Sequence, residues 1–116
     1  MTERSLYMIE WSRVDELRDE LGDDDFAEIV DLFIAEVEDV IAIMRKGTDP
    51  TDLQRHLHFL KGSALNLGFA HFSDLCRDGE FACKEGRPGD VDLCRLRDAF
   101  LGCREVFLAG RADATG

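Results

Sequence analysis

Residues 49–68 have the sequence D-P-T-D-L-Q-R-H-L-H-F-L-K-G-S-A-L-N-L-G, which contains the start and stop signals of one amphipathic helix. Asp49 is a natural N-cap, and Pro50 suits the first helical position, where a missing N–H costs nothing. Gly68 can end the helix in the left-handed conformation. Apolar residues recur between these signals at steps of three and four. They are Leu53, Leu57, Leu60, Ala64 and Leu67. The segment predicts a helix with one buried face.

Other segments on both sides have the same helical period. We expect helices at about residues 12–21, 25–46, 71–85 and 90–109. The longest has an apolar face of about six turns. This face comprises Phe26, Ile29, Val30, Phe33, Val37, Val40, Ile41 and Met44.

Polar residues and glycines predict where these helices begin and end. Ser12 can cap the first, and Asp25 with Glu28 has the spacing of a capping box for the second. Gly110 is expected to close the last helix. Gly79 lies within the helix predicted at 71–85, where glycine costs up to about 1 kcal/mol relative to alanine.

The fold class that follows is all-α. No segment alternates with period two over the length of a strand, and the connections between the helices are short. We therefore predict an antiparallel up-down four-helix bundle with an additional short N-terminal helix. The chain of 116 residues fits one domain, 1–116, with its core at about 9–109.

Composition excludes several classes of partner. The net charge is -11, with 25 acidic against 14 basic residues, so neither nucleic acid nor an anionic membrane is an expected partner. No apolar run approaches the roughly 20 residues that span a bilayer, and no secretory signal is visible. The cysteines form no C-x-x-C pair, and we expect reduced, mostly buried thiols in a cytoplasmic protein. They are Cys76, Cys83, Cys94 and Cys103.

One outward strip of the helix at 50–67 combines a histidine with features that suit chemistry. Its residues lie at steps of three and four and are Gln54, Arg55, His58, Lys61, Gly62 and Leu65. A neutral imidazole such as that of His58 has a ring nitrogen available as a nucleophile. Gly62 removes a side chain that would shade the ring, and Lys61 supplies positive charge beside it. Leu65 is an apolar residue on a wet face, which suits docking of a partner.

The other histidines have simpler interpretations. We expect His56 to be solvated, because no glycine opens access to it, and His71 to be a surface or capping residue. A zinc or redox site built from the cysteines and His71 is a rival interpretation. It is disfavoured, because metal sites usually show tight ligand pairs such as C-x-x-C, and none appears.

The run H-F-L-K-G-S-A-L-N-L-G, residues 58–68, resembles the signature of histidine-containing phosphotransfer domains of two-component phosphorelays. The segments D-L-F-I-A-E, residues 31–36, and L-C-R-D-G-E, residues 75–80, resemble the flanking helices of that family. The likeness covers about residues 9–109.

The resemblance implies a phosphocarrier rather than an ATP-dependent kinase, which agrees with the lack of a nucleotide-binding loop. His58 would accept a phosphoryl group, at Nε2, from the aspartyl phosphate of a response-regulator receiver domain and pass it to another receiver. Lys61 would orient the phosphoryl oxygens, while Gln54, Arg55, Gly62 and Leu65 would meet the partner. The receiver would hold the Mg²⁺, so this chain would need no cofactor or metal of its own.

Two alternatives concern the context of the domain. The chain could be an interaction module that binds a receiver or a kinase without carrying phosphate. It could also be a part of a larger hybrid histidine kinase, although we favour a free-standing, monomeric protein.

Overall fold

The structure, a computed structural model, describes residues 9–115, with side chains for residues 9–110. Residues 1–8 and 116, which the single-domain prediction also covers, lie outside the described residues. The helices are α2 (Trp11–Leu21), α3 (Asp23–Lys46), α4 (Pro50–Leu67), α5 (Ala70–Lys84) and α6 (Leu93–Thr115), and a 3₁₀ turn, η1, spans Pro88–Asp90. No strand occurs within residues 9–115, so the all-α prediction is confirmed.

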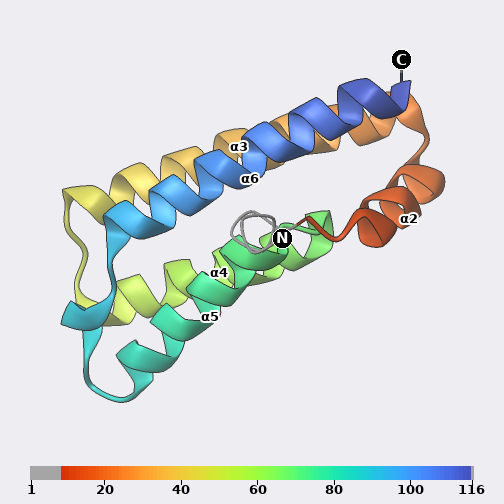
Figure 1. Cartoon of the computed structure of the whole chain (residues 1–116). Helices are drawn as coiled ribbons and strands as arrows, with labels where there is room; N and C mark the ends of the chain where they lie inside the picture. Colours follow the sequence, from red (N-terminus) through yellow and green to blue (C-terminus); the bar gives the residue numbers. More distant parts are fainter. Residues whose placement is uncertain (1–8, 116) are drawn as a thin grey trace.

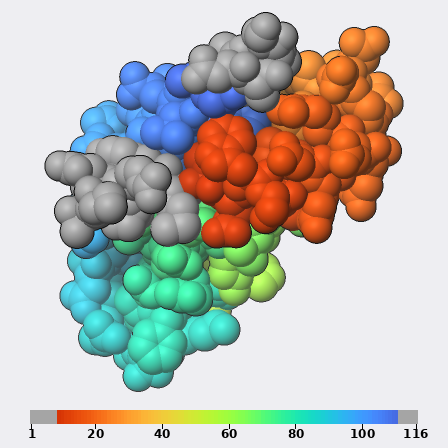
Figure 2. All heavy atoms as spheres, turned by 45° about the vertical axis from the view of Figure 1, so that its right-hand side comes forward, coloured from red at the N-terminus to blue at the C-terminus, as the bar shows by residue number. Residues whose placement is uncertain are grey.

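The four long helices alternate in direction along the bundle (Figure 1). In this view α3 lies beside α6, and α4 lies beside α5, while α2 crosses one end. Figure 2 shows α2, in red and orange, between the blue α6 and the green end of the α4–α5 pair. The predicted up-down bundle with an additional short helix is therefore correct.

A hydrogen bond and a close backbone contact position α2 at this end of the bundle. The backbone N–H of Glu10 donates to the carbonyl oxygen of Gly68 at 2.7 Å. Gly68 has φ +81°, and a Cβ there would lie 2.7 Å from the carbonyl oxygen of Glu10. Glycine at this position thus ends α4 and lets the chain before α2 approach closely.

Aromatic side chains fill the core between the helices. Phe69, in the connection between α4 and α5, is fully buried. Its ring meets that of Phe33 edge-on at 5.4 Å and also lies 5.5 Å from that of Phe107. Such buried rings contribute a large part of the apolar area that stabilises a small domain.

The predicted core face of α4 is confirmed. All five of its predicted apolar residues are buried, Asp49 accepts a hydrogen bond from the N–H of Asp52 at 2.8 Å, and Pro50 is the first helical residue. The helix therefore begins and ends where its signals indicate.

Gly79 allows α5 to pack closely on α4. It is buried, and a Cβ there would lie 3.1 Å from Cδ1 of Leu57 and 3.6 Å from Cγ1 of Val91. The low helix propensity of glycine is offset by this close approach of the two helices.

Several predicted details at the helix ends were wrong. Helix α2 begins at Trp11, and α3 begins at Asp23, directly after Gly22. Neither helix has a side-chain cap. The predicted Ser12 cap and the predicted Asp25–Glu28 capping box are therefore not formed. Ile29, assigned to the apolar face of α3, is exposed. Helix α6 begins at Leu93 and continues through Gly110 to Thr115.

The position of Gly110 has a packing explanation. The ring of Trp11 stacks on that of Phe107 with 4° between the planes. A Cβ added to Gly110 would lie only 2.3 Å from Cη2 of Trp11. Glycine here makes room for the indole instead of ending the helix.

Candidate functional site

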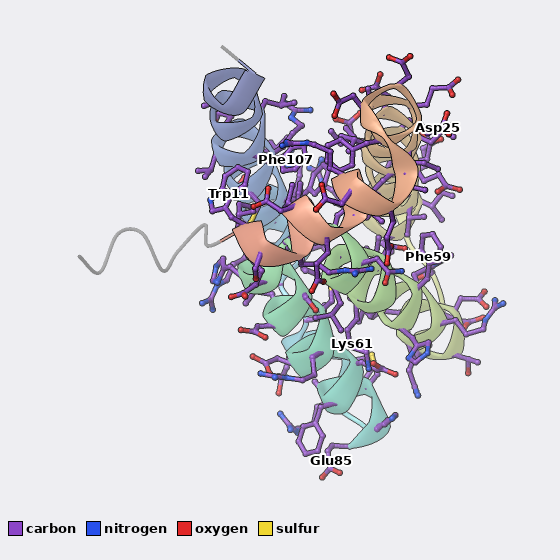
Figure 3. All side chains as sticks on the ribbon, turned by 90° about the vertical axis from the view of Figure 1, so that its right-hand side faces the viewer. Trp11, Asp25, Phe59, Lys61, Glu85 and Phe107 are labelled. Atoms are coloured by element: carbon purple, nitrogen blue, oxygen red, sulfur yellow. The ribbon has the colours of Figure 1, made fainter. Side chains whose placement is uncertain are left out.

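His58 lies on the outer surface of α4, and its side chain is 69 % exposed. The burial of the leucine stripe fixes the rotation of the helix, which places the imidazole in solvent. In Figure 3 Lys61, one turn further on, lies between α4 and α5, whereas Phe59 lies on the other side of α4. The site is therefore built on the α5 side of the α4 surface.

The His58 ring is exposed, but it is not free. Its Nδ1 lies 2.9 Å from Oε2 of Glu80 on α5. The other carboxylate oxygen of Glu80, Oε1, lies 2.8 Å from Nζ of Lys61. One carboxylate thus joins the histidine and the lysine that the sequence analysis placed in the site.

Glu80 is almost fully buried, with 7 % of its side chain exposed. Burial alone raises the pKa of Glu80, but the contacts with Lys61 and then His58 outweigh this effect and hold the pKa below its usual value. The carboxylate is consequently ionised near neutral pH. A buried carboxylate of this kind needs the partners that it has, since a charge buried without partners is strongly destabilising.

The contact with Glu80 determines which nitrogen of His58 is available. An ionised carboxylate only accepts hydrogen bonds, so Nδ1 of the neutral ring is the nitrogen that carries the proton and donates. The lone pair is then on Nε2, at the other side of the ring. This is the arrangement by which a buried partner orients an imidazole and selects its tautomer.

The remaining residues of the predicted strip have different surroundings. A Cβ on Gly62 would meet nothing within 4 Å, so the surface one turn after His58 is open. Leu65 is exposed, and Gln54 is half-buried. Arg55 is exposed and forms an ion pair with Asp52, one turn earlier on α4.

Glu80 was missed as a site residue by the sequence analysis. A signal for it exists, because Phe72, Cys76 and Glu80 follow each other at steps of four on the inner face of α5, and all three are buried. An ionisable residue in an apolar stripe requires a partner of opposite charge on a neighbouring helix. Its partner could not be named without knowing how α5 lies against α4.

The cysteines are free thiols in separate surroundings. Cys76 and Cys103 are buried, Cys83 is half-buried and Cys94 is exposed. Burial raises the pKa of the Cys76 thiol and raises that of Cys103 to about 11, so both remain protonated and unreactive near neutral pH.

Among the residues that the structure describes, no three His, Cys, Asp or Glu side chains are grouped so as to hold a metal ion. No helix of the described part is long and apolar enough to cross a bilayer.

In a comparison with protein families, residues 28–105 match the family model of the Hpt domain. This range contains all of α4 and α5, and therefore His58, Lys61 and Glu80. A comparison with curated proteins gave no significant match, and neither did a comparison with solved structures.

Proposed function

The chain belongs to the Hpt domain family, the histidine phosphotransfer modules of two-component signalling, and on this premise we propose that His58 is its phosphoacceptor. The proposed donor is the aspartyl phosphate of a response-regulator receiver domain, and the proposed acceptor is another receiver. The observation that carries the proposal is the 2.9 Å contact between Nδ1 of the exposed His58 ring and the buried Glu80 carboxylate. It leaves Nε2 as the nucleophilic nitrogen.

During the transfer the ring gains a positive charge, which the Glu80 carboxylate compensates. The Nε2 lone pair forms the N–P bond, and the electron pair of the breaking P–O bond leaves with the aspartate of the receiver. The ring, which keeps its Nδ1 proton, becomes cationic opposite the Glu80 carboxylate. In the reverse step the N–P electron pair returns to Nε2, and the leaving group is the neutral imidazole.

Glu80 is a positioning residue in this scheme, and Lys61 supports it. Phosphoryl transfer depends chiefly on orientation and on charge stabilisation. The ion pair of 2.8 Å with Lys61 holds the carboxylate in place, and the ammonium also offers positive charge beside the developing phosphoryl group. Gly62 would leave room for the receiver to reach the ring in line.

The partner would rest on the exposed surface around the histidine. Leu65 offers apolar area to a docking receiver, and Gln54 and Arg55 offer polar contacts one turn before His58. We propose that the receiver supplies the Mg²⁺ and that this chain acts as a monomeric cytoplasmic carrier with no cofactor of its own.

The direct test is transfer of labelled phosphate from a panel of purified receiver domains that have been charged by a small phosphodonor. We expect label that is acid-labile and base-stable on the wild-type chain and none on His58→Gln. His56→Gln is the matched control, because it removes an imidazole from the same helix and should retain the label. Label on the His58→Gln protein would overturn the site, and a wild-type chain that binds a charged receiver without taking label would show an interaction module.

A further inference from the structure

The two oxygens of the Glu80 carboxylate have different neighbours. Oε1 faces Nζ of Lys61 at 2.8 Å. Oε2 faces Nδ1 of His58 at 2.9 Å and also Nζ of Lys84, in the last turn of α5, at 3.8 Å. His58 and Lys84 thus share one oxygen atom, which brings a second ammonium to the edge of the site.

The two lysines are held to different degrees. The Lys61 side chain is 26 % exposed and makes the shorter contact, whereas that of Lys84 is 58 % exposed and makes the longer one. The ammonium of Lys84 is largely solvated and its contact is long, so this ion pair contributes little free energy. Lys84 can therefore leave Glu80 readily, while Lys61 remains bound to it.

The other lysine and arginine side chains of α4 and α5 are paired with carboxylates that are not part of the site. Arg55 pairs with Asp52, and Arg77, on α5, pairs with Asp74 and Asp78. Glu80, by contrast, carries one negative charge against two ammonium groups. Within this cluster two ammonium groups contact a single carboxylate, in a chain whose net charge is -11.

We propose that Lys84 is a second phosphoryl-binding cation, which moves from Glu80 to the phosphoryl oxygens when His58 is phosphorylated. This inference rests on the proposed function and extends it. A phosphoryl group brings roughly two negative charges and strong acceptor oxygens to the ring, and a flexible ammonium nearby is attracted to them. Glu80 still accepts the hydrogen bond from Nδ1 and keeps its ion pair with Lys61, so the ring stays oriented while Lys84 moves.

The consequence is thermodynamic as well as structural. Lys84 stabilises the phosphorylated carrier, whereas its weak pair with Glu80 stabilises the unphosphorylated one only slightly. The partition of phosphate between this chain and a receiver should therefore depend on Lys84. The contribution should also weaken with added salt, because the side chain is exposed.

The test compares Lys84→Met with Arg77→Met, a control that removes an exposed cation from the same helix. The two measurements are the equilibrium partition of labelled phosphate with a receiver that charges the wild-type chain and the half-life of the isolated phosphorylated chain. We expect Lys84→Met to shift the partition toward the receiver about threefold to tenfold and to shorten the half-life. Arg77→Met should change neither, Lys84→Arg should restore both, and the effect should diminish at high salt.

The outcomes separate this inference from the proposed function. If the wild-type chain takes no label on His58, the proposed function itself fails. If it does, an unchanged partition and half-life in Lys84→Met would overturn the role of Lys84. A change in transfer rate in both directions with an unchanged partition would also overturn it, since Lys84 would then contact the receiver and not the phosphoryl group.

Discussion

Nδ1 of His58 lies 2.9 Å from Oε2 of Glu80, although the two residues are 22 positions apart in the chain. The exposed residue of this pair comes from α4 and the buried one from α5, so the packing of the two helices sets the orientation of the ring. A solvated imidazole would sample several rotamers and both tautomers. Here one tautomer is selected, and Nε2 is the nitrogen left for chemistry.

Replacing Glu80 by glutamine should slow phosphotransfer without abolishing it. The amide keeps the size of the side chain, but it can either accept from or donate to Nδ1, so it no longer selects one tautomer. We expect the rate of transfer from a charged receiver to fall about tenfold, by analogy with buried partners that orient histidine ligands. Rapid-quench measurement of labelled phosphate on His58 tests this, with Lys61→Met as a companion that leaves the carboxylate in place. A Glu80→Gln rate equal to that of the wild type would contradict the positioning role.

The same variant should show how stability depends on pH. The pKa of Glu80 in the folded protein lies below its ordinary value of 4.5, so the ionised carboxylate stabilises the fold. This stabilisation is complete above the unfolded pKa and is lost as pH falls through the lower folded pKa. The groups that face the carboxylate are His58 and Lys61 from α4, and Lys84 and the neutral thiols Cys76 and Cys83 from α5.

Urea unfolding of the wild type and Glu80→Gln measures this contribution. Above about pH 5 we expect the variant to have a lower free energy of unfolding, by about 1–3 kcal/mol, because a buried charged partner has been replaced. The difference should narrow between about pH 5 and pH 3, below the range in which imidazoles usually titrate. A difference that stays constant down to pH 3 would show that the carboxylate is not ionised at the higher pH.

The fold was more predictable from sequence than the site. Signals in α4 are local, since Asp49, Pro50 and Gly68 act on their own helix, and its leucine stripe repeats without interruption. The acidic start of α3 has several possible caps in a row, which is why its first residue was misplaced. Gly110 looks like a helix end in sequence, but it is explained by a contact with Trp11 from the other end of the chain.

Glu80 shows which part of the functional site could not be predicted from the sequence. His58, Lys61 and Gly62 share one helix, so their spacing alone places them on one surface. Glu80 belongs to another helix, and its distance from His58 depends on the rotation of α5 against α4. The close approach of Gly79 to Leu57 is part of the packing between the two helices, and no local pattern reveals it.

Substitutions of Gly62 can separate the access of the receiver to His58 from the stability of the fold. A Cβ there meets nothing within 4 Å, so Gly62→Ala should raise the free energy of unfolding by up to about 1 kcal/mol through helix propensity. Helical side chains lean toward the N-terminus, so a longer side chain at this position would cover the turn that contains His58. We expect Gly62→Gln to be as stable as the wild type but to accept phosphate at least about tenfold more slowly. Equal rates for Gly62→Gln and the wild type would show that the receiver does not approach over this turn.

Gly79→Ala should have the opposite effect on stability. A Cβ at this position would lie 3.1 Å from Cδ1 of Leu57, which is fully buried and has little room to move. Overpacking of this kind costs about 1–3 kcal/mol and outweighs the gain in helix propensity. Urea unfolding should show a net loss on the order of 1 kcal/mol, and a net gain would show that α4 and α5 are not packed as tightly as the structure has them.

Gly110→Ala should be visible in the fluorescence of Trp11, the single tryptophan of the chain. A Cβ at residue 110 would lie 2.3 Å from Cη2 of the indole, so the ring must move off its stack on Phe107. Because the ring is already partly exposed, the displacement should shift its emission to longer wavelength. It should also weaken the docking of α2 on the bundle. The control is Gly62→Ala, which is remote from Trp11 and should leave the spectrum unchanged. Phosphate transfer to His58 should be retained in Gly110→Ala, since Trp11 and Gly110 lie on α2 and α6 and the site is built from α4 and α5. An unchanged spectrum would show that Trp11 does not lie on this face of α6.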